Sequence, residues 1–139
     1  FMDVCREDPV ITMEKLLNEI DADIIFVDLH AEATAEKMTF ANYFAPRVTA
    51  VIGTHTHVQT ADEQIINGCA YITDAGMCGV YASILGRDTE EVIARSIYNE
   101  STRYTPAQGP AVISGVLIDI DEKTNRANQI ERVQIRPKG

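Results

Sequence analysis

The three histidines of this 139-residue sequence fall at two places, and each place follows an apolar run that is typical of a buried strand. His30 follows the run 24–29 (IIFVDL), and His55 and His57 follow the run 48–52 (VTAVI). Neighbouring strands lie only about 4.8 Å apart, and ligands of α/β sheets bind at the carboxyl ends of the parallel strands. We therefore expect the three imidazoles to converge there. His55 and His57 are two residues apart, which in an extended segment places both on the same side.

Three converging imidazoles predict a metal centre, because neutral imidazole binds zinc, iron and manganese when carboxylates complete the ligand set. A lone histidine at a strand end more often has a structural or surface role. A His-x-His pair also arises by chance, so the prediction depends on His30 at the matching position. His30, His55 and His57 are the predicted ligands.

Further candidates surround these histidines. Asp28, Glu32 and Asp62 are candidates to orient the imidazoles by accepting hydrogen bonds from their second nitrogens. Taken singly, each of these acids fits a helix cap or a solvated surface better than an orienting role. Met77 and Tyr81 lie in a glycine-bearing loop and are candidates to border a substrate pocket, with simple packing or an oligomer contact as the alternatives.

Hydrophobic periodicity places the secondary structure around these sites. The expected helices cover 12–20, capped by Thr12, then 33–44, with Met38 on its apolar face, and 89–100, capped by Thr89. The expected strands cover 23–29, 48–52 up to Gly53, a hairpin of 65–66 and 69–73 around Asn67-Gly68, and a second hairpin of 111–121 and 128–135. Residues 74–86 read as a long ordered loop.

This order predicts an α/β fold, with βαβ units followed by an antiparallel hairpin at the C-terminal end. At this length residues 1–139 form one domain. The sequence opens on Phe1-Met2, and residues 1–5 read like the tail of a strand already under way, so we expect a fragment of a larger domain. Residues 136–139 are expected to be frayed.

Composition limits the partners. A net charge of −9 and a pI near 4.7 give no basic surface for duplex nucleic acid or an anionic membrane, so an anionic substrate needs a local source of positive charge such as a metal ion. The three cysteines follow no CxxC spacing, which favours reduced thiols and a cytoplasmic location. No apolar stretch approaches the ~20 residues that span a bilayer.

Three strings suggest a family. They are Asp28 to Thr34 (DLHAEAT), Gly53 to Asp62 (GTHTHVQTAD) and Ile72 to Met77 (ITDAGM). Together they closely resemble the YmdB-type branch of the calcineurin-like metallophosphoesterases, and the resemblance runs through essentially the whole chain. It implies a sandwich of two sheets flanked by helices, of which this chain is the C-terminal half.

The resemblance also implies a function. Members of this branch are metal-dependent phosphodiesterases with two divalent ions (Fe, Mn or Zn), and 2′,3′-cyclic nucleotides such as 2′,3′-cyclic AMP are the expected substrates. His30, His55 and His57 match three metal-ligand positions. The remaining ligands, and a histidine that acts near the leaving group, belong to an N-terminal half, so we expect no catalytic acid in this chain and little or no activity from it alone. A small phosphodiester and further copies of the same protein are the expected partners.

Two alternatives stay open. Relatives that resemble poly-gamma-glutamate capsule synthesis proteins also carry a His-x-His motif after a strand, although the longer match favours the first family. A non-catalytic oligomeric or regulatory module of the same fold is the alternative from a different class. In such a module the histidines would hold a structural metal or none.

Overall fold

The computed structural model describes residues 7–137, so the strand tail expected at 1–5 lies outside the described residues. The elements follow one another as α1 (Pro9–Glu19), β1 (Phe26–His30), α2 (Thr34–Phe44), β2 (Ala50–Thr54), β3 (Gln64–Ile66), β4 (Cys69–Ile72), β5 (Gly79–Val80), α3 (Thr89–Tyr98), β6 (Ala111–Asp121) and β7 (Arg126–Ile135). Within 7–137, no helix has the length and apolar character needed to cross a membrane.

Two sheets form the body of the molecule, which confirms the predicted α/β fold. The first has the strand order β1-β2-β4-β3, in which β1, β2 and β4 are parallel and β3 is antiparallel to β4. The second has the order β5-β6-β7 and is antiparallel. The expected hairpins around Asn67-Gly68 and between β6 and β7 are both present, and Asn67 and Gly68 take the positive φ values that such a turn needs.

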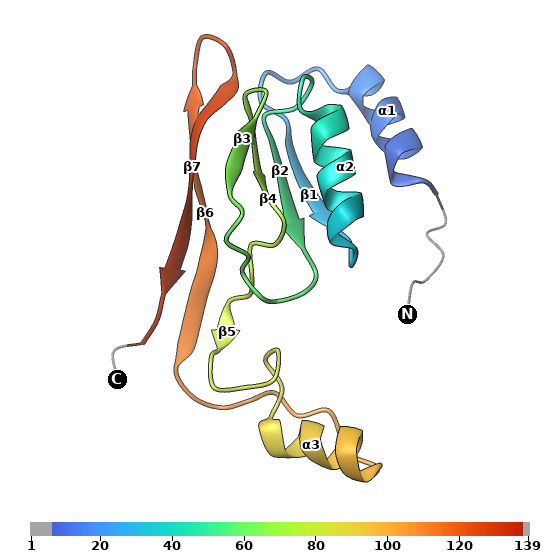
Figure 1. Cartoon of the computed structure of the whole chain (residues 1–139), viewed down its shortest axis with the longest axis vertical. Helices are drawn as coiled ribbons and strands as arrows, with labels where there is room; N and C mark the ends of the chain where they lie inside the picture. The colour runs from blue at the N-terminus through green and yellow to red at the C-terminus, as the bar shows by residue number, and fades with distance from the viewer. Residues whose placement is uncertain (1–6, 138–139) are drawn as a thin grey trace.

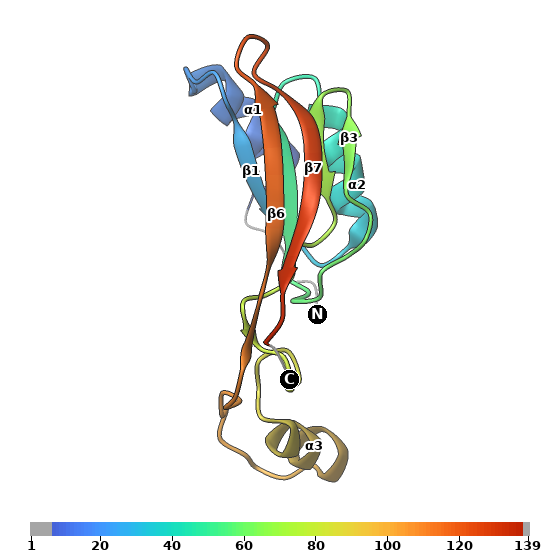
Figure 2. The same cartoon turned by 90° about the vertical axis from the view of Figure 1, so that its left-hand side faces the viewer.

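The four-stranded sheet lies between two covering layers. Figure 1 shows α1 and α2 on one face and the long β6–β7 hairpin on the other, and Figure 2 shows the hairpin running along the sheet. Successive residues of β2 serve the two interfaces, since Val51 belongs to the core under the helices and Ile52 to the core under the hairpin. The central strands β2 and β4 are therefore buried on both faces, as the run 48–52 predicts. The same prediction is wrong for the run 24–29, because the residues of β1 alternate between exposed and half-buried and Phe26 is 58% exposed.

The helices begin at acidic caps that the periodicity does not reveal. The side chain of Asp8 accepts hydrogen bonds from the N–H groups of Val10 and Ile11, so α1 begins at Pro9 and not at the expected cap, Thr12. Asp88 caps α3 in the same way, and Thr89 is the first helical residue. In both cases an acid just before the helix outcompetes the threonine as the cap.

The buried face of α2 differs from the expected one. The spacing places Met38 with Ala41 and Phe44, but Met38 is 42% exposed, and the residue that joins the buried face is Lys37. Lys37 precedes Ala41 by one helical turn and Phe44 by two, so it lies on the same side of the helix. A charged side chain at a core position is the physical reason why the pattern was misleading.

Strand β2 runs one residue past the glycine that was expected to end it. Gly53 is buried inside the strand, where a Cβ atom would lie 1.8 Å from the carbonyl oxygen of Thr73 and 3.0 Å from a side-chain carbon of Lys37. Only glycine leaves room for this approach. The strand consequently ends at Thr54, directly before His55.

Helix α3 stands away from the sandwich. Figures 1 and 2 both show it beyond the end of the sheets, joined to them by the loops on either side. Within the described part of the chain none of its residues is buried, and Ile97 of its apolar face is 71% exposed. The helix is therefore held by local contacts such as the ion pair between Arg87, just before the helix, and Glu91 in its first turn, at 2.6 Å.

The two described cysteines are expected to differ strongly in reactivity. Cys69 is buried in β4, and this burial raises its pKa to about 11, whereas Cys78 is exposed. Because the thiolate is the reactive form, we expect an alkylating reagent at pH 8 to modify Cys78 at least ~100-fold faster than Cys69. Timed labelling followed by peptide mass spectrometry measures both rates. Similar rates would show that β4 opens easily to solvent.

Candidate metal centre at the carboxyl edge of the sheet

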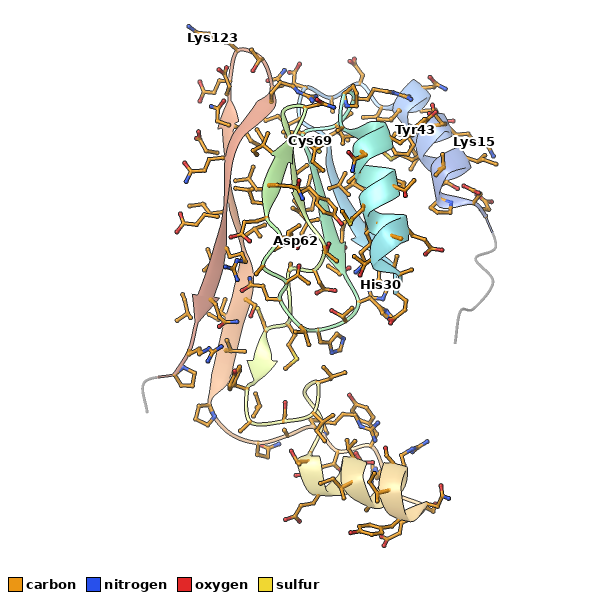
Figure 3. All side chains as sticks on the ribbon, in the orientation of Figure 1. Lys15, His30, Tyr43, Asp62, Cys69 and Lys123 are labelled. Carbon is orange, nitrogen blue, oxygen red and sulfur yellow. The ribbon has the colours of Figure 1, made fainter. Side chains whose placement is uncertain are left out.

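The carboxyl ends of β1 and β2 place His30 beside the loop that carries the other two histidines. The strands are parallel neighbours, and His30, the last residue of β1, is in register with Thr54, the last residue of β2. Figure 3 shows His30 at this end of the sheet. The next residue after Thr54 is His55, which therefore begins its loop close to His30.

Past Thr54 the chain turns at once, so the expected extended His-x-His segment is wrong. His55 and His57 have φ values of 116° and 66°, which residues other than glycine rarely adopt. The two imidazoles consequently do not share one side and bond to different partners. Backbone strain of this kind costs about 1–3 kcal/mol per residue and is typical of functional sites.

A buried ion pair behind the loop fixes this turn. Lys37 Nζ donates to the carbonyl oxygen of Thr54 at 2.8 Å and to Asp74 Oδ2 at 3.3 Å, and neither charged side chain is exposed. Asp74 Oδ2 also accepts a hydrogen bond from the N–H of Thr56 at 2.9 Å. The peptide groups before and after His55 are therefore both held by the Lys37–Asp74 pair.

Asp74 is stabilised in its charged form. Burial acts to raise the pKa of this carboxyl, but hydrogen bonds from the N–H groups of Gly76 and Thr56, with a further contribution from Lys37, outweigh burial and hold the pKa below its ordinary value. The carboxyl of Asp74 therefore carries its negative charge at neutral pH.

The imidazoles of His30 and His55 meet edge to face. Their ring centroids are 4.8 Å apart with an interplanar angle of 84°, and His30 Nε2 lies 3.0 Å from His55 Nδ1. The other nitrogen of each ring also has a partner. His30 Nδ1 lies 3.1 Å from Thr54 Oγ1, and His55 Nε2 lies 2.9 Å from Glu32 Oε2.

These partners determine where the ring protons are. Thr54 Oγ1 donates its one proton to Asp28 Oδ1 at 2.7 Å, so it accepts a hydrogen bond from His30 Nδ1–H. The carboxylate of Glu32 can only accept, so His55 Nε2 also carries a proton. In neutral rings this leaves lone pairs on His30 Nε2 and His55 Nδ1, the two nitrogens that face each other. Facing lone pairs repel unless a positive charge lies beside both.

The separation of the two nitrogens fits two ligands of one metal ion. Metal–nitrogen bonds of about 2.0–2.1 Å, meeting at roughly 90–109°, place two ligand nitrogens about 2.8–3.4 Å apart. The separation of 3.0 Å lies within this range. Over residues 7–137, no group of three or more His, Cys, Asp and Glu side chains is placed to hold an ion together. The structure thus brings two of the three predicted ligands together.

His57 is placed differently. Its Nδ1 lies 3.4 Å from the carbonyl oxygen of Leu85, an acceptor, so Nδ1 carries the proton and Nε2 has the lone pair. All three histidines therefore share one property, which is that one ring nitrogen faces an oxygen and the other has a lone pair for a cation. This is the usual state of metal-binding histidines.

The candidate orienting acids have two kinds of contact. Glu32 bonds to an imidazole directly and Asp28 acts through a threonine hydroxyl, as described above. Asp62 instead accepts hydrogen bonds from the hydroxyls of Thr60, at 2.6 Å, and Thr73, so it joins the loop after β2 to the end of β4. Burial acts to raise the pKa of Asp62, but hydrogen bonds from these two hydroxyls and from backbone N–H groups together outweigh burial, and the pKa lies below its ordinary value.

Met77 and Tyr81, the two pocket candidates, line a hollow of about 320 Å³ that His57 also borders. A larger hollow, of about 460 Å³, lies between α1 and the side chains of Val27 and Phe40, and its lining includes none of the histidines. The hollow beside His57 is therefore the one that belongs to the candidate site.

Lys37, Thr54 and Asp74 are site residues that the sequence reasoning missed, although the sequence contained a signal for each. Lys37 has the helical spacing of the buried residues of α2. Thr54 lies between an apolar strand and His55. Asp74 follows the apolar run of β4, just as the histidines follow those of β1 and β2. Applying the strand-end rule to the third parallel strand would have found it.

The fold and this site define an α/β domain whose histidines gather at the carboxyl ends of parallel strands. The profile of the YmdB-like protein family matches residues 1–133, and the chain belongs to this family. The resemblance read from the sequence is thereby confirmed. A Bacillus subtilis (strain 168) protein named 2′,3′-cyclic-nucleotide 2′-phosphodiesterase is 48% identical over 132 residues, covering 93% of this chain and 50% of that protein.

Solved structures show the same fold. A hypothetical protein from Thermus thermophilus matches with a TM-score of 0.88 and 37% identity, covering 95% of this chain and 52% of that one. A structure described as a novel phosphatase of Mycoplasma pneumoniae matches with a TM-score of 0.87 and 35% identity, covering 93% and 47%. The chain thus spans about half the length of these relatives.

Proposed function

We propose that the complete protein is a metal-dependent phosphodiesterase that hydrolyses 2′,3′-cyclic nucleotides such as 2′,3′-cyclic AMP. One observation carries the metal dependence, namely the hydrogen-bond chain that leaves two imidazole lone pairs facing each other at 3.0 Å. A cation beside both nitrogens resolves their repulsion. The name of the Bacillus subtilis relative supports the reaction and the substrate class.

Two divalent ions (Fe, Mn or Zn) are the proposed cofactors. His30 and His55 would share one of them, and His57 would bind from its separate position. When bound, such ions neutralise charge on the phosphate oxygens and lower the pKa of the attacking water. The role of this chain is to hold the imidazoles of His30 and His55 in the tautomer that can bind a metal, through Glu32 and the Asp28–Thr54 hydrogen bond. Hydrogen bonds to the second nitrogen of a metal-binding histidine generally have this effect.

Proton transfer to the leaving group is assigned outside this chain. We propose that residues 1–139 form the C-terminal half of a larger domain, whose N-terminal half supplies the remaining ligands and the catalytic histidine. This is consistent with coverage of about half of each relative. The isolated chain is accordingly expected to be inactive. Cytoplasmic location and homo-oligomer formation stay predictions.

The test is hydrolysis of 2′,3′-cyclic AMP by the full-length protein before and after treatment with a chelator. Chelation is expected to abolish release of adenosine monophosphate, and adding Mn²⁺ or Fe²⁺ to restore it, because the phosphate charge is otherwise unbalanced. The 139-residue chain serves as the matched comparison and should show no turnover after the same metal loading. Turnover that survives complete metal removal, or turnover by the short chain alone, would contradict the proposal.

A further inference from the structure

The hollow beside His57 is built from four separate parts of the chain. Its walls come from the loop after β2, from the segment between β4 and α3 that contains β5, from the start of β6 and from the end of β7. Its volume of about 320 Å³ lies at the small end of the range for small-molecule sites, which is about 300–1,000 Å³. Since His57 forms part of its wall, a ligand in this hollow would lie next to His57.

The lining combines apolar and uncharged polar side chains with one cation. Met77, Leu85 and Val112 supply apolar surface, and Arg136 is the one Lys or Arg among the described residues that line it. The guanidinium carbon of Arg136 lies 4.4 Å from the centre of the Tyr81 ring. The sequence predicts a frayed end from residue 136 on. For residue 136 this prediction is wrong, because Arg136 forms part of the wall of the hollow.

Among the described residues, Arg136 is held by one hydrogen bond, and the terminal N–H groups of its guanidinium stay available to a ligand. Its Nε donates to Gln134 Oε1 at 2.8 Å, and within residues 7–137 neither terminal nitrogen of the guanidinium makes a hydrogen bond. Tyr81 is 51% exposed, so much of its surface is open to a ligand. Together the ring and the guanidinium, here called the Tyr81–Arg136 plate, offer flat surface for stacking and N–H groups for an acceptor.

We propose that this hollow is a nucleobase subsite, in which the base of the substrate stacks on the Tyr81–Arg136 plate while its phosphodiester lies at the histidines. The inference rests on the proposed function and adds to it the residues that recognise the nucleoside. A base matches the lining because its faces are apolar and its edge carries hydrogen-bond acceptors. A phosphate group matches it less well, since Met77, Leu85 and Val112 offer no donors. Of the polar lining side chains, those of Gln59 and Ser83 already donate to backbone carbonyl oxygens.

The test compares two substrates in the full-length protein, 2′,3′-cyclic AMP and glycerol 1,2-cyclic phosphate, which has no base. In Tyr81→Leu and Arg136→Gln, the ratio of kcat/KM for the nucleotide to kcat/KM for the glycerol diester is expected to fall about tenfold, because the base loses its stacking partner. Tyr98→Leu is the matched control. It removes an exposed tyrosine on α3, away from the site, and should leave the ratio unchanged.

A binding measurement separates failure of the subsite from failure of the proposed function. Calorimetry with adenosine and the chelator-treated full-length protein should show binding that weakens about tenfold in Tyr81→Leu. If the protein hydrolyses neither diester but adenosine binding depends on Tyr81, the proposed function fails and the subsite stands. If both variants keep the native substrate ratio, or the adenosine affinity is unchanged in Tyr81→Leu, the subsite is overturned.

Discussion

Replacing His55 by alanine in the full-length protein is expected to lower its affinity for Mn²⁺ by at least ~100-fold. The reason is that His55 Nδ1 and His30 Nε2 face each other at 3.0 Å and would share one ion, so the variant loses one of two neighbouring nitrogen ligands. Loss of an outer partner alone typically costs 10–100-fold in metal affinity, and loss of the ligand itself should exceed this. Competition with a chromophoric chelator measures the affinity.

A graded series sharpens this prediction. Glu32→Ala removes the carboxylate 2.9 Å from His55 Nε2 and should cost about 10- to 100-fold, less than loss of the imidazole. Glu90→Ala, which removes an acid of α3 away from the sheet, is the matched control and should leave the affinity unchanged. An unchanged Mn²⁺ affinity in His55→Ala would contradict this prediction. It would mean that a proton, and not a metal ion, lies between His30 Nε2 and His55 Nδ1.

The gathering of His30 and His55 was predictable because it depends on strand ends. Apolar runs of four to six residues mark buried parallel strands, and residues that follow neighbouring strands meet at one edge of the sheet. The register of His30 with Thr54 confirms this reasoning. The alternation of polar and apolar residues identified the β6–β7 hairpin for a similar reason, since one face of the hairpin packs against the four-stranded sheet and the other faces solvent.

The conformation of the loop after β2 was not predictable from its own residues. Nothing in GTHTH indicates the positive φ of His55, because that turn is imposed by Lys37 and Asp74, which lie 17 residues before Thr54 and 18 residues after Thr56. Lys37 was missed because a charged residue does not count toward an apolar face. Arg136 was missed because its partner, Tyr81, is distant in sequence.

The stability of this loop leads to the second large prediction. Lys37→Met is expected to lower the free energy of unfolding of the full-length protein by about 3–5 kcal/mol, because it leaves the carboxylate of Asp74 buried without its cation. Urea denaturation followed by circular dichroism measures the change. Lys15→Met is the matched control, since Lys15 is exposed on α1, and it should stay within about 0.5 kcal/mol of the native protein.

A double variant separates the ion pair from simple packing. Lys37→Met combined with Asp74→Asn should be less destabilised than the sum of the two single variants, because no uncompensated charge remains buried.

The contribution of Asp74 to stability should depend on pH in a definite direction. Since the folded pKa of Asp74 is lowered, its contribution to stability is present above the unfolded value of about 3.8 and is lost as the pH falls through the folded pKa. The difference between native protein and Lys37→Met should therefore shrink at low pH.

The same variant connects stability to the proposed metal centre. The Lys37–Asp74 pair holds the carbonyl of Thr54 and the N–H of Thr56, so loss of the pair frees the strained backbone of His55 on both sides. Mn²⁺ affinity should consequently fall in Lys37→Met even under conditions where the protein is fully folded, although Lys37 is not one of the proposed metal ligands. If affinity stays native in the folded variant, the ion pair supports only the core, and His55 keeps its position through Glu32 and His30 alone.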